Sequence, residues 1–428
     1  MNAAAAASRC EDEARAMMAA IQQRDFAAAT RDFGAEMKQG LGNAKLAQVM
    51  DSLAAKLGPL VRLGEARTSR AGNQDLVIVP SHFERGDLDA RVACDDAGRI
   101  TGFHMLPAAP ARESSGYRVP PYADLASTQK VAVTVGPAEL PGELVLPKGL
   151  AKVPAVVMLH GSGPHDMDET IGPNKPFLDI ALGLAAKGVA SLRYEKRTRA
   201  HPELFAKRED ITLAREVDDD AVAAVRMLEQ RPEVDRDRIY LVGHSLGGQL
   251  APRIAAKEHL AGAVLLAPPA APLPETLERQ LNSVSHGKGS DATVSALRTQ
   301  AAHLKALLAG EDAPADLPFG LPASYWRELA ARDPIADAKA ASCRFLVQQG
   351  GRDYQVTLAD DYRLWERAFA SDPRIELRTY PALNHLFQRG SGPSGPQEYT
   401  VAQNVAPEVI DDMAAWIKAP APSSSAIR

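Results

Sequence analysis

The stretch 238–256 constrains the fold most, because a short apolar run ends there in a serine flanked by glycines. Residues 239–242, Ile-Tyr-Leu-Val, are typical of a buried parallel strand. Residues 243–247 then read G-x-S-x-G, and a run of small residues typical of a helix follows. This order of strand, sharp turn and helix predicts that Ser245 is strained and exposes its hydroxyl above the sheet edge, as a nucleophile does. The two glycines of the motif lack the Cβ atoms that would collide where strand and helix pass closely.

The composition is that of an ordinary globular protein. The 428 residues are 45% hydrophobic and 24% charged, and the formal net charge of -5 indicates neither a nucleic acid nor an anionic membrane surface as partner. No apolar run approaches the roughly 20 residues that span a bilayer. Residues 1–10 lack the basic and apolar segments of a signal peptide. Their alanine run fits the remnant of a cleaved signal, which slightly favours a secreted or periplasmic location over the cytoplasm and leaves localisation open.

The three cysteines are too few for a disulfide framework and lack metal-ligand spacing. Cys343 precedes a predicted core strand, so we expect it to be a buried small hydrophobe. A bridge between Cys10 and Cys94 is an option that the sequence leaves open.

Two regions with different patterns predict two domains. Residues 10–106 show two helical segments followed by a strand meander, which predicts a small α+β unit. Residues 107–128 are proline-rich and indicate a linker. Residues 129–418 alternate strands with helices, which predicts a mainly parallel sheet covered on both faces. The fold class is therefore α/β for the larger domain.

One segment of the larger domain departs from this alternation. Residues 267–345 contain more than seventy positions without a strand pattern, among them helical stretches at 276–284 and 291–308. An insertion there lies over the carboxyl ends of the strands, where ligands bind in such sheets. We therefore predict a helical cap at about 270–342. Tyr325 and Trp326 are candidates for lining its pocket, although two aromatic residues on a helix are also typical of core.

A serine nucleophile needs a general base, because its hydroxyl is weak at its free pKa. Four histidines follow Ser245: His259, His286, His303 and His385. The first lies beside the helix of the motif and the next two fall in the predicted cap. His385 alone follows the last predicted strand, in a loop that can reach the sheet edge, so we predict that it is the base.

The acid that orients this base is expected after the penultimate strand. Asp353 follows the strand 345–349 and two glycines that allow a tight turn. Its predicted role is to accept a hydrogen bond from His385 Nδ1 and to fix the tautomer. Asp360 and Asp361, in the following helix, are the alternatives.

An oxyanion hole needs two backbone N–H groups. One is expected from Leu246, directly after the nucleophile, and the other from Ser162 in the loop 160–164, His-Gly-Ser-Gly-Pro. We interpret His160 as a structural residue of this loop. His165 is a candidate for the rim of the substrate pocket.

The carboxylates that follow this loop raise the question of a metal. His165, Asp166 and Asp168 lie close together, but the sequence offers no further ligand cluster at suitable spacing. A polar pocket rim is therefore the preferred interpretation, and we expect no metal and no cofactor.

These motifs together resemble the α/β-hydrolase superfamily over residues 129–418, near bacterial carboxylesterase-like, dienelactone hydrolase, bile-acid acyltransferase-like and serine aminopeptidase groups. The phrases that carry the resemblance lie at 160–164, 192–197, 243–248, 349–356 and 383–387. Relatives usually carry Asp at the position of Glu195, which leaves the catalytic prediction unchanged. The resemblance implies an α/β-hydrolase fold with a Ser-His-Asp triad.

The first hundred residues resemble the nuclear-transport-factor-two-like domain that precedes the hydrolase domain in a group of bacterial esterase-like proteins. The phrases that carry this resemblance lie at 57–60, 82–90 and 96–102, and none is a chemical motif. We interpret this unit as a folding and dimerisation module in preference to a second active site, so a homodimer through it is one expectation.

The leading hypothesis is a serine hydrolase that cleaves a small-molecule carboxylic ester through an acyl-enzyme. A peptidase or thioesterase would use the same triad, and the sequence barely discriminates among them. An aminopeptidase needs an acidic anchor for the amine, which we cannot place, and dienelactone hydrolases use a cysteine where this chain has Ser245. A hypothesis of another class is a non-catalytic binding or scaffold protein, against which the complete triad argues.

Overall fold

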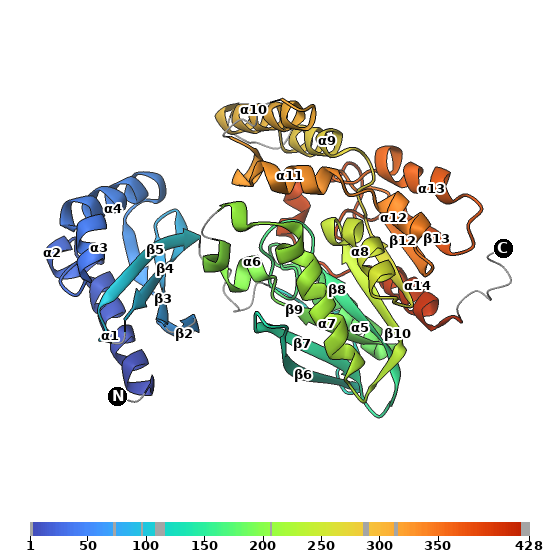
Figure 1. Ribbon diagram of the computed structural model, residues 1–428, viewed down its shortest axis with the longest axis horizontal. Coiled ribbons are helices and arrows are strands. Elements are labelled where there is room, and N and C mark those ends of the chain that lie inside the picture. The colour runs from blue at the N-terminus through green and yellow to red at the C-terminus, as the bar shows by residue number, and fades with distance from the viewer. Residues whose placement is uncertain are drawn as a thin grey trace. The chain divides into compact units, whose positions relative to one another are not determined.

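The structure is a computed structural model that describes residues 3–71, 74–95, 97–107, 116–205, 208–285, 291–311 and 316–420. The chain divides into two compact units, Met1–Ser114 and Ser115–Arg428, whose elements follow one another along the colour bar of Figure 1. Each unit folds around its own buried apolar residues.

The first unit packs helices against an antiparallel sheet, as the helix-then-meander pattern predicts. The helices are α1 (Ala3–Gln22), α2 (Phe26–Ala29), α3 (Ala35–Gly40) and α4 (Asn43–Leu57). The strands are β1 (Leu60–Leu63), β2 (Arg67–Ala71), β3 (Gln74–Phe83), β4 (Gly86–Cys94) and β5 (Ile100–Pro107), in the order β1-β3-β4-β5 with β2 paired to β3. The sequence did not predict β2, because its residues Arg-Thr-Ser-Arg-Ala show no apolar alternation.

A disulfide joins the first helix of this unit to its sheet. Cys10 of α1 and Cys94 of β4 are bridged across a sequence separation of 84 residues, and both are buried. A bridge between residues this far apart restricts the unfolded chain strongly, by about 4.5 kcal/mol in the loop-entropy description. The third cysteine, Cys343, has a free thiol and is only partly buried.

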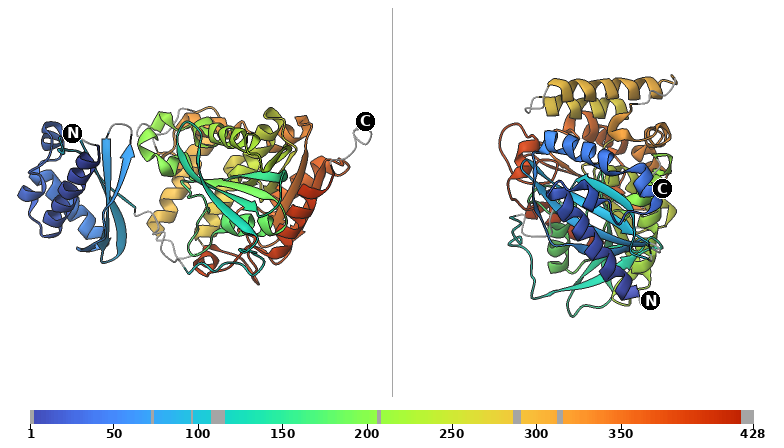
Figure 2. Two further views of the ribbon diagram at one scale, coloured as in Figure 1. Left: turned by 90° about the horizontal axis from the view of Figure 1, so that it is seen from below. Right: turned by 90° about the vertical axis from the view of Figure 1, so that its left-hand side faces the viewer.

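The second unit is built on an eight-stranded sheet in the order β13-β12-β11-β10-β8-β9-β7-β6. The six neighbouring strands β13, β12, β11, β10, β8 and β9 pair in parallel. β7 pairs antiparallel with β9, and β6 pairs antiparallel with β7 at the edge of the sheet. The bounds are β6 (Thr128–Val135), β7 (Leu140–Pro147), β8 (Val153–Leu159), β9 (Ala190–Tyr194), β10 (Val234–His244), β11 (Gly262–Leu266), β12 (Arg344–Gly350) and β13 (Ile375–Tyr380). Figure 2 shows how the strands twist across the unit.

Helices cover both faces of this sheet, so its central strands are buried on both sides. On β8, Val156 and Met158 pack in the cluster with α5 (Pro176–Ala186) and α14 (Pro407–Lys418). The alternate residues Val157 and Leu159 pack in the cluster with α7 (Asp219–Glu229), α8 (Leu246–Lys257) and α13 (Arg363–Phe369). The predicted α/β architecture is confirmed. Within the described ranges, no helix has both the length and the apolar character needed to cross a bilayer.

Residues 116–127, directly before β6, contact the rest of the second unit. The Tyr117 hydroxyl donates to Asp179 of α5 (2.8 Å), and the Tyr122 hydroxyl donates to the Val405 carbonyl (2.7 Å). Residues 116–127 of the predicted linker 107–128 therefore pack on the second unit. Residues 108–115 lie outside the described ranges.

The segment between β11 and β12 forms the helices α9 (Leu273–Ser285), α10 (Asp291–Leu308), α11 (Ala323–Ala330) and α12 (Pro334–Ala340). The first two pack side by side, and α10 also packs against α11 (Figure 1). These helices lie within the predicted cap at about 270–342. Leu304, Leu307 and Trp326 are buried and join the large core cluster, so the segment packs on the sheet unit rather than standing apart from it.

Candidate active site

Ser245 lies at the carboxyl end of β10, directly before α8. Its φ of 52° and ψ of -116° are strained for a residue with a Cβ. The serine N–H donates to the Leu266 carbonyl (2.9 Å), which ties the turn to β11. A Cβ on Gly247 would lie 2.2 Å from the Leu159 carbonyl oxygen, and one on Gly243 would lie 2.3 Å from the Gly247 carbonyl oxygen. The predicted need for both glycines is therefore confirmed.

His385 and Asp353 meet beyond the ends of β13 and β12. His385 Nδ1 donates to Asp353 Oδ2 (2.7 Å), and both residues are at most 5% exposed. The other carboxylate oxygen, Oδ1, accepts the N–H groups of Gln355 (2.8 Å) and Val356 (3.0 Å). The carboxylate is thus fixed on both oxygens and can hold the imidazole in one orientation.

Two glycines let the acid loop approach the histidine loop. A Cβ on Gly350 would lie 2.5 Å from the Asn384 carbonyl oxygen, and one on Gly351 would lie 2.6 Å from Pro381 Cα. Side chains at these positions would therefore separate the loop of Asp353 from that of His385.

The alternative acids are engaged elsewhere. Asp361 is fully buried, but its Oδ1 accepts the N–H groups of Ala270 (3.0 Å) and Ala271 (2.9 Å), and its Oδ2 pairs with Arg279 (2.6 Å). This carboxylate anchors the start of the cap segment. Asp360 accepts from the Thr357 hydroxyl at the surface (2.7 Å).

His259 and His303, the other described histidines after Ser245, are placed by other elements. His259 follows the far end of α8, a helix of 12 residues and therefore roughly 18 Å long. His303 of α10 donates through Nδ1 to the Asp316 carbonyl (2.9 Å). His286 lies outside the described ranges.

His244, the residue before the serine, connects it to the histidine loop. His244 Nε2 donates to the His385 carbonyl (3.1 Å), and the two rings lie 4.6 Å apart between centroids. Its Nδ1 donates to Glu169 Oε2 (3.0 Å), and Glu169 Oε1 accepts the Gly161 N–H (2.6 Å). Glu169 was not predicted from the sequence, yet it joins the turn of Ser245 to the loop 160–164.

The surroundings of Glu169 and His244 favour the ionised form of both side chains. Burial disfavours a charged Glu169, but the His244 charge and hydrogen bond outweigh it and lower the pKa of the carboxyl to about 2. Burial likewise disfavours a charged His244, and Glu169 raises its pKa nevertheless. A His244 imidazolium can donate from both ring nitrogens, as its two contacts require.

The pH dependence of the free energy of unfolding tests whether Glu169 and His244 are both charged. The lowered pKa of Glu169 adds stability above about pH 4.5 that is lost as pH falls toward 2, and the raised pKa of His244 adds stability that is lost as pH rises through it. We expect Glu169→Gln to lower the free energy of unfolding by about 3 kcal/mol near pH 6, and by less near pH 3. Urea unfolding at both pH values measures this.

The control is Glu408→Gln, which removes the half-exposed partner of Arg389 at the surface. We expect it to change the free energy of unfolding by less than about 1 kcal/mol at either pH. If Glu169→Gln lowered the free energy of unfolding by as much near pH 3 as near pH 6, Glu169 and His244 would not be a charged pair.

The predicted oxyanion loop follows β8 and touches the serine turn. Ser162 is exposed, and its carbonyl accepts from His165 Nε2 (2.8 Å). A Cβ on Gly161 would lie 3.4 Å from Ser245 Cβ, so the loop backbone passes close to the serine. Lys196 Nζ donates to the Gly161 carbonyl (2.9 Å), a contact that the sequence did not predict.

His160 has the structural role that its position suggested. Its ring is buried between Phe177 and Tyr194, and Nε2 donates to the Asp166 carbonyl (3.0 Å). Burial lowers the pKa of His160 to about 3, so the ring is neutral at pH 7.

The carboxylates near this loop are occupied by protein donors. Asp166 Oδ1 accepts the N–H groups of Asp168 (3.2 Å) and Thr170 (2.9 Å). Asp168 pairs with Lys175 (2.9 Å) and with the buried Arg193. Over the described ranges, no group of three or more His, Cys, Asp or Glu side chains has the arrangement of a metal site.

The two aromatic candidates for the pocket lie on α11 and are 3% exposed. The Tyr325 hydroxyl donates to Glu216 Oε2 (2.7 Å). The Trp326 ring packs edge-on against the Tyr325 ring, with 5.8 Å between the ring centroids. Both belong to the large core cluster. Their assignment to the substrate pocket stays a prediction.

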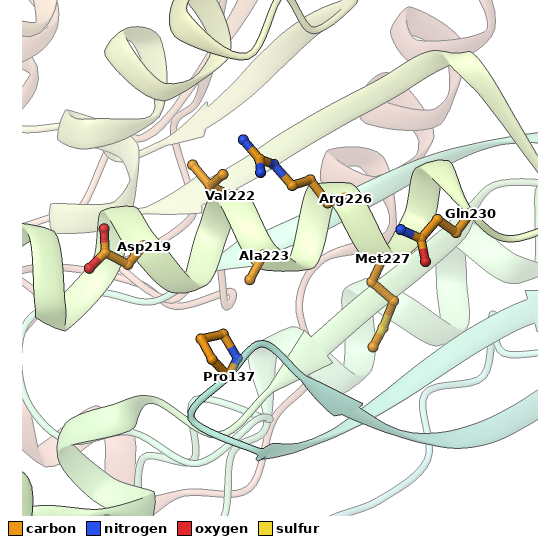
Figure 3. A pocket seen from close by; sticks show the side chains of 7 residues that line it. All are labelled: Pro137, Asp219, Val222, Ala223, Arg226, Met227 and Gln230. Carbon is orange, nitrogen blue, oxygen red and sulfur yellow. The ribbon is translucent and has the colours of Figure 1, made fainter.

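A hollow of about 430 Å³ lies elsewhere in the unit, between α7 and the turn that joins β6 to β7. Figure 3 shows Ala223 and Met227 of α7 facing Pro137 of that turn. None of the candidate catalytic residues lines this hollow.

The sequence pattern of the alpha/beta hydrolase family matches residues 156–400, which include Ser245, Asp353 and His385. The chain belongs to the alpha/beta hydrolase family. This alpha/beta hydrolase is 35% identical over 410 residues to Esterase EstD of Thermotoga maritima, and the match covers 95% of each chain. Residues 14–103 match a family described as a protein of unknown function (DUF3887).

Solved structures also resemble the alpha/beta hydrolase. Est1E from Butyrivibrio proteoclasticus is 19% identical with a TM-score of 0.42, covering 67% of this chain and 98% of that chain. The 2,6-dihydroxy-pseudo-oxynicotine hydrolase is 17% identical with a TM-score of 0.43, covering 68% of each chain. Identities this low indicate nothing about the substrate.

Proposed function

We propose that this alpha/beta hydrolase cleaves carboxylic esters of small molecules through an acyl-enzyme on Ser245. The observation that carries the proposal is the buried 2.7 Å hydrogen bond between His385 and Asp353. These residues follow β13 and β12, which run parallel to β10, so they lie at the same edge of the sheet as the strained Ser245. The match to an esterase along nearly the whole chain supports an ester as substrate.

The geometry supports a defined division of roles. With Nδ1–H donated to Asp353, the His385 Nε2 lone pair is available to take the Ser245 proton as Oγ attacks the ester carbonyl. The Leu246 N–H stands in the first turn of α8, where N–H groups have no partner within the helix, and would bind the oxyanion together with the Ser162 N–H.

Collapse of the tetrahedral intermediate breaks the bond to the alkoxide, which leaves as the alcohol with the proton from His385. Water then enters, loses a proton to His385 and attacks the acyl-enzyme. The second tetrahedral intermediate releases the carboxylic acid and returns the proton to Ser245.

A substrate panel tests the reaction. We expect the wild-type chain to turn over short-chain p-nitrophenyl esters faster than the matched p-nitroanilide and thioester, because the relative that matches along 95% of the chain is named an esterase. A fluorophosphonate is expected to add once, at Ser245, as located by mass spectrometry of the peptide. Labelling without turnover of any acyl substrate would contradict hydrolysis, and preferred cleavage of the anilide or thioester would establish the peptidase or thioesterase alternative.

The binding-protein hypothesis is less well supported. A scaffold has no need of a strained Ser245 or of a buried carboxylate aligned on His385, and both features cost stability.

The bridge between Cys10 and Cys94 supports a secreted or periplasmic location, because oxidising compartments maintain disulfides. Homodimerisation through residues 10–106 stays a prediction, which light scattering of the full chain tests.

A further inference from the structure

We propose that Lys196 is a positioning residue of the oxyanion hole, which holds the peptide group between Gly161 and Ser162 so that its N–H faces the reacting oxygen. The inference rests on the proposed ester hydrolysis and assigns a role to a buried cation that the triad chemistry does not use.

The strand register brings this lysine to the loop. β8 and β9 pair in parallel, with Ala155 opposite Ala190 and Val157 opposite Leu192, an offset of 35 residues. The same offset continued beyond the strand ends places Lys196 opposite Gly161. The hydrogen bond from Lys196 Nζ to the Gly161 carbonyl (2.9 Å) has this separation of 35 residues.

The contact fixes a specific N–H group. A peptide bond is planar and trans, so the carbonyl of Gly161 and the N–H of Ser162 point in opposite directions. When Lys196 holds the carbonyl on one side, the Ser162 N–H must point to the other. Gly161 itself passes against Ser245, where a Cβ would lie 3.4 Å from the serine Cβ. The held peptide therefore belongs to a loop whose backbone passes close to the serine that attacks the substrate.

The Gly161 residue is fixed from its other side as well. Its N–H donates to Glu169 Oε1 (2.6 Å), so both of its backbone polar groups end on buried charged side chains. Hydrogen bonds to ionised groups are about twice as strong as neutral ones. Rotation of the Gly161–Ser162 peptide would break the hydrogen bond from Lys196 to the Gly161 carbonyl. This hydrogen bond therefore keeps the Ser162 N–H in place before substrate arrives.

The lysine is held by a buried network that reaches the cap segment. Lys196 is 2% exposed, and its Nζ also donates to Glu216 Oε1 (2.6 Å). Glu216 Oε2 accepts the Tyr325 hydroxyl (2.7 Å). The carboxylate compensates the buried ammonium, and Tyr325 fixes the carboxylate. A cation at the Gly161 carbonyl also polarises the peptide group and strengthens its N–H as a donor to developing negative charge.

The expected effect is that of a weakened oxyanion donor. Loss of one such donor costs about 10²- to 10³-fold in kcat. We expect Lys196→Met to lower kcat about 10²-fold and to leave KM within about threefold, because the misplaced N–H matters mainly once charge develops. The best p-nitrophenyl ester of the panel is the substrate.

Inhibitor binding separates this role from general structural damage. A trifluoromethyl ketone with the same acyl chain forms a bond to Ser245 Oγ, passes the serine proton to His385 and carries an oxyanion, whereas the matching secondary alcohol cannot. We expect Lys196→Met to weaken the ketone about 10²-fold and to leave the alcohol within about threefold. Lys175→Met is the matched control, because Lys175 contacts Asp168 nearby and not the loop carbonyl.

The double variant Lys196→Met with Glu216→Gln serves if the single variant does not fold, since it removes both members of the buried pair. Wild-type kcat in either folded variant, or equal weakening of ketone and alcohol, would overturn the role of Lys196. If the role of Lys196 is overturned while the wild type and Lys175→Met still hydrolyse the ester, the proposed ester hydrolysis stands. An inactive wild type would instead remove the proposed function itself.

Discussion

Ser245→Ala is expected to lower kcat for ester hydrolysis at least about 10³-fold while the protein stays folded. The variant keeps the turn of residues 243–247 and its hydrogen bond from the residue 245 N–H to Leu266, but it removes the atom that forms the acyl-enzyme. His385→Ala is expected to show a similar loss. The double variant should lose little more than either single variant, because the two groups act in one proton-coupled step.

Ser162→Ala is the matched control for this experiment. Its side chain has no role in the proposed mechanism, which uses only its backbone N–H, so kcat should stay within about threefold of wild type. The measurement is the steady-state rate with the best p-nitrophenyl ester, with circular dichroism to show that each variant is folded. Full activity in Ser245→Ala would exclude the acyl-enzyme.

The local parts of the site could be predicted from the sequence because each is written in a few consecutive residues. A strand followed by G-x-S-x-G specifies Ser245, and the strand of residues 345–349 followed by two glycines specifies Asp353. The order of serine, acid and histidine in this fold then leaves His385. The structure adds the reason for the second pair of glycines, which is the backbone of the histidine loop.

The supporting charges could not be predicted in the same way, because their partners are set by tertiary packing. Glu169 meets His244 across 75 residues, and Lys196 meets Gly161 only through the register of β8 and β9. An acidic residue beside Asp166 and Asp168 in the sequence looks like part of a solvated rim. Residues 192–197 carry the resemblance to the family, but their pattern does not indicate that Lys196 is buried.

Similar reasons explain the differences in the fold. The β2 sequence, Arg-Thr-Ser-Arg-Ala, has no alternation of apolar residues, so its pairing with β3 has no signal in the sequence pattern. Tyr117 and Tyr122 lie in a proline-rich stretch, where composition predicts a linker, yet their hydroxyl groups find partners on the second unit. Composition describes the average of a segment and does not show such single contacts.

Asp353→Asn is the second change with a large expected effect, about 10³- to 10⁴-fold in kcat. The reason lies in the two oxygens of the carboxylate. Oδ1 faces the N–H groups of Gln355 and Val356, so the amide oxygen of asparagine must take that place. The amide NH₂ is then directed at His385 Nδ1. It can only donate there, which forces the imidazole proton to Nε2 and removes the lone pair that Ser245 needs.

The comparison with the neighbouring carboxylates decides the assignment. Asp360→Asn should leave kcat within about threefold of wild type, because the exposed Asp360 side chain contacts Thr357 and Arg279 and not His385 among the contacts described. Asp361→Asn should lower the stability of the cap segment through Ala270, Ala271 and Arg279 without moving the histidine tautomer. Steady-state rates and urea unfolding of the three variants separate the two effects. An active Asp353→Asn beside an inactive Asp360→Asn or Asp361→Asn would transfer the role of the acid from Asp353 to the residue whose variant is inactive.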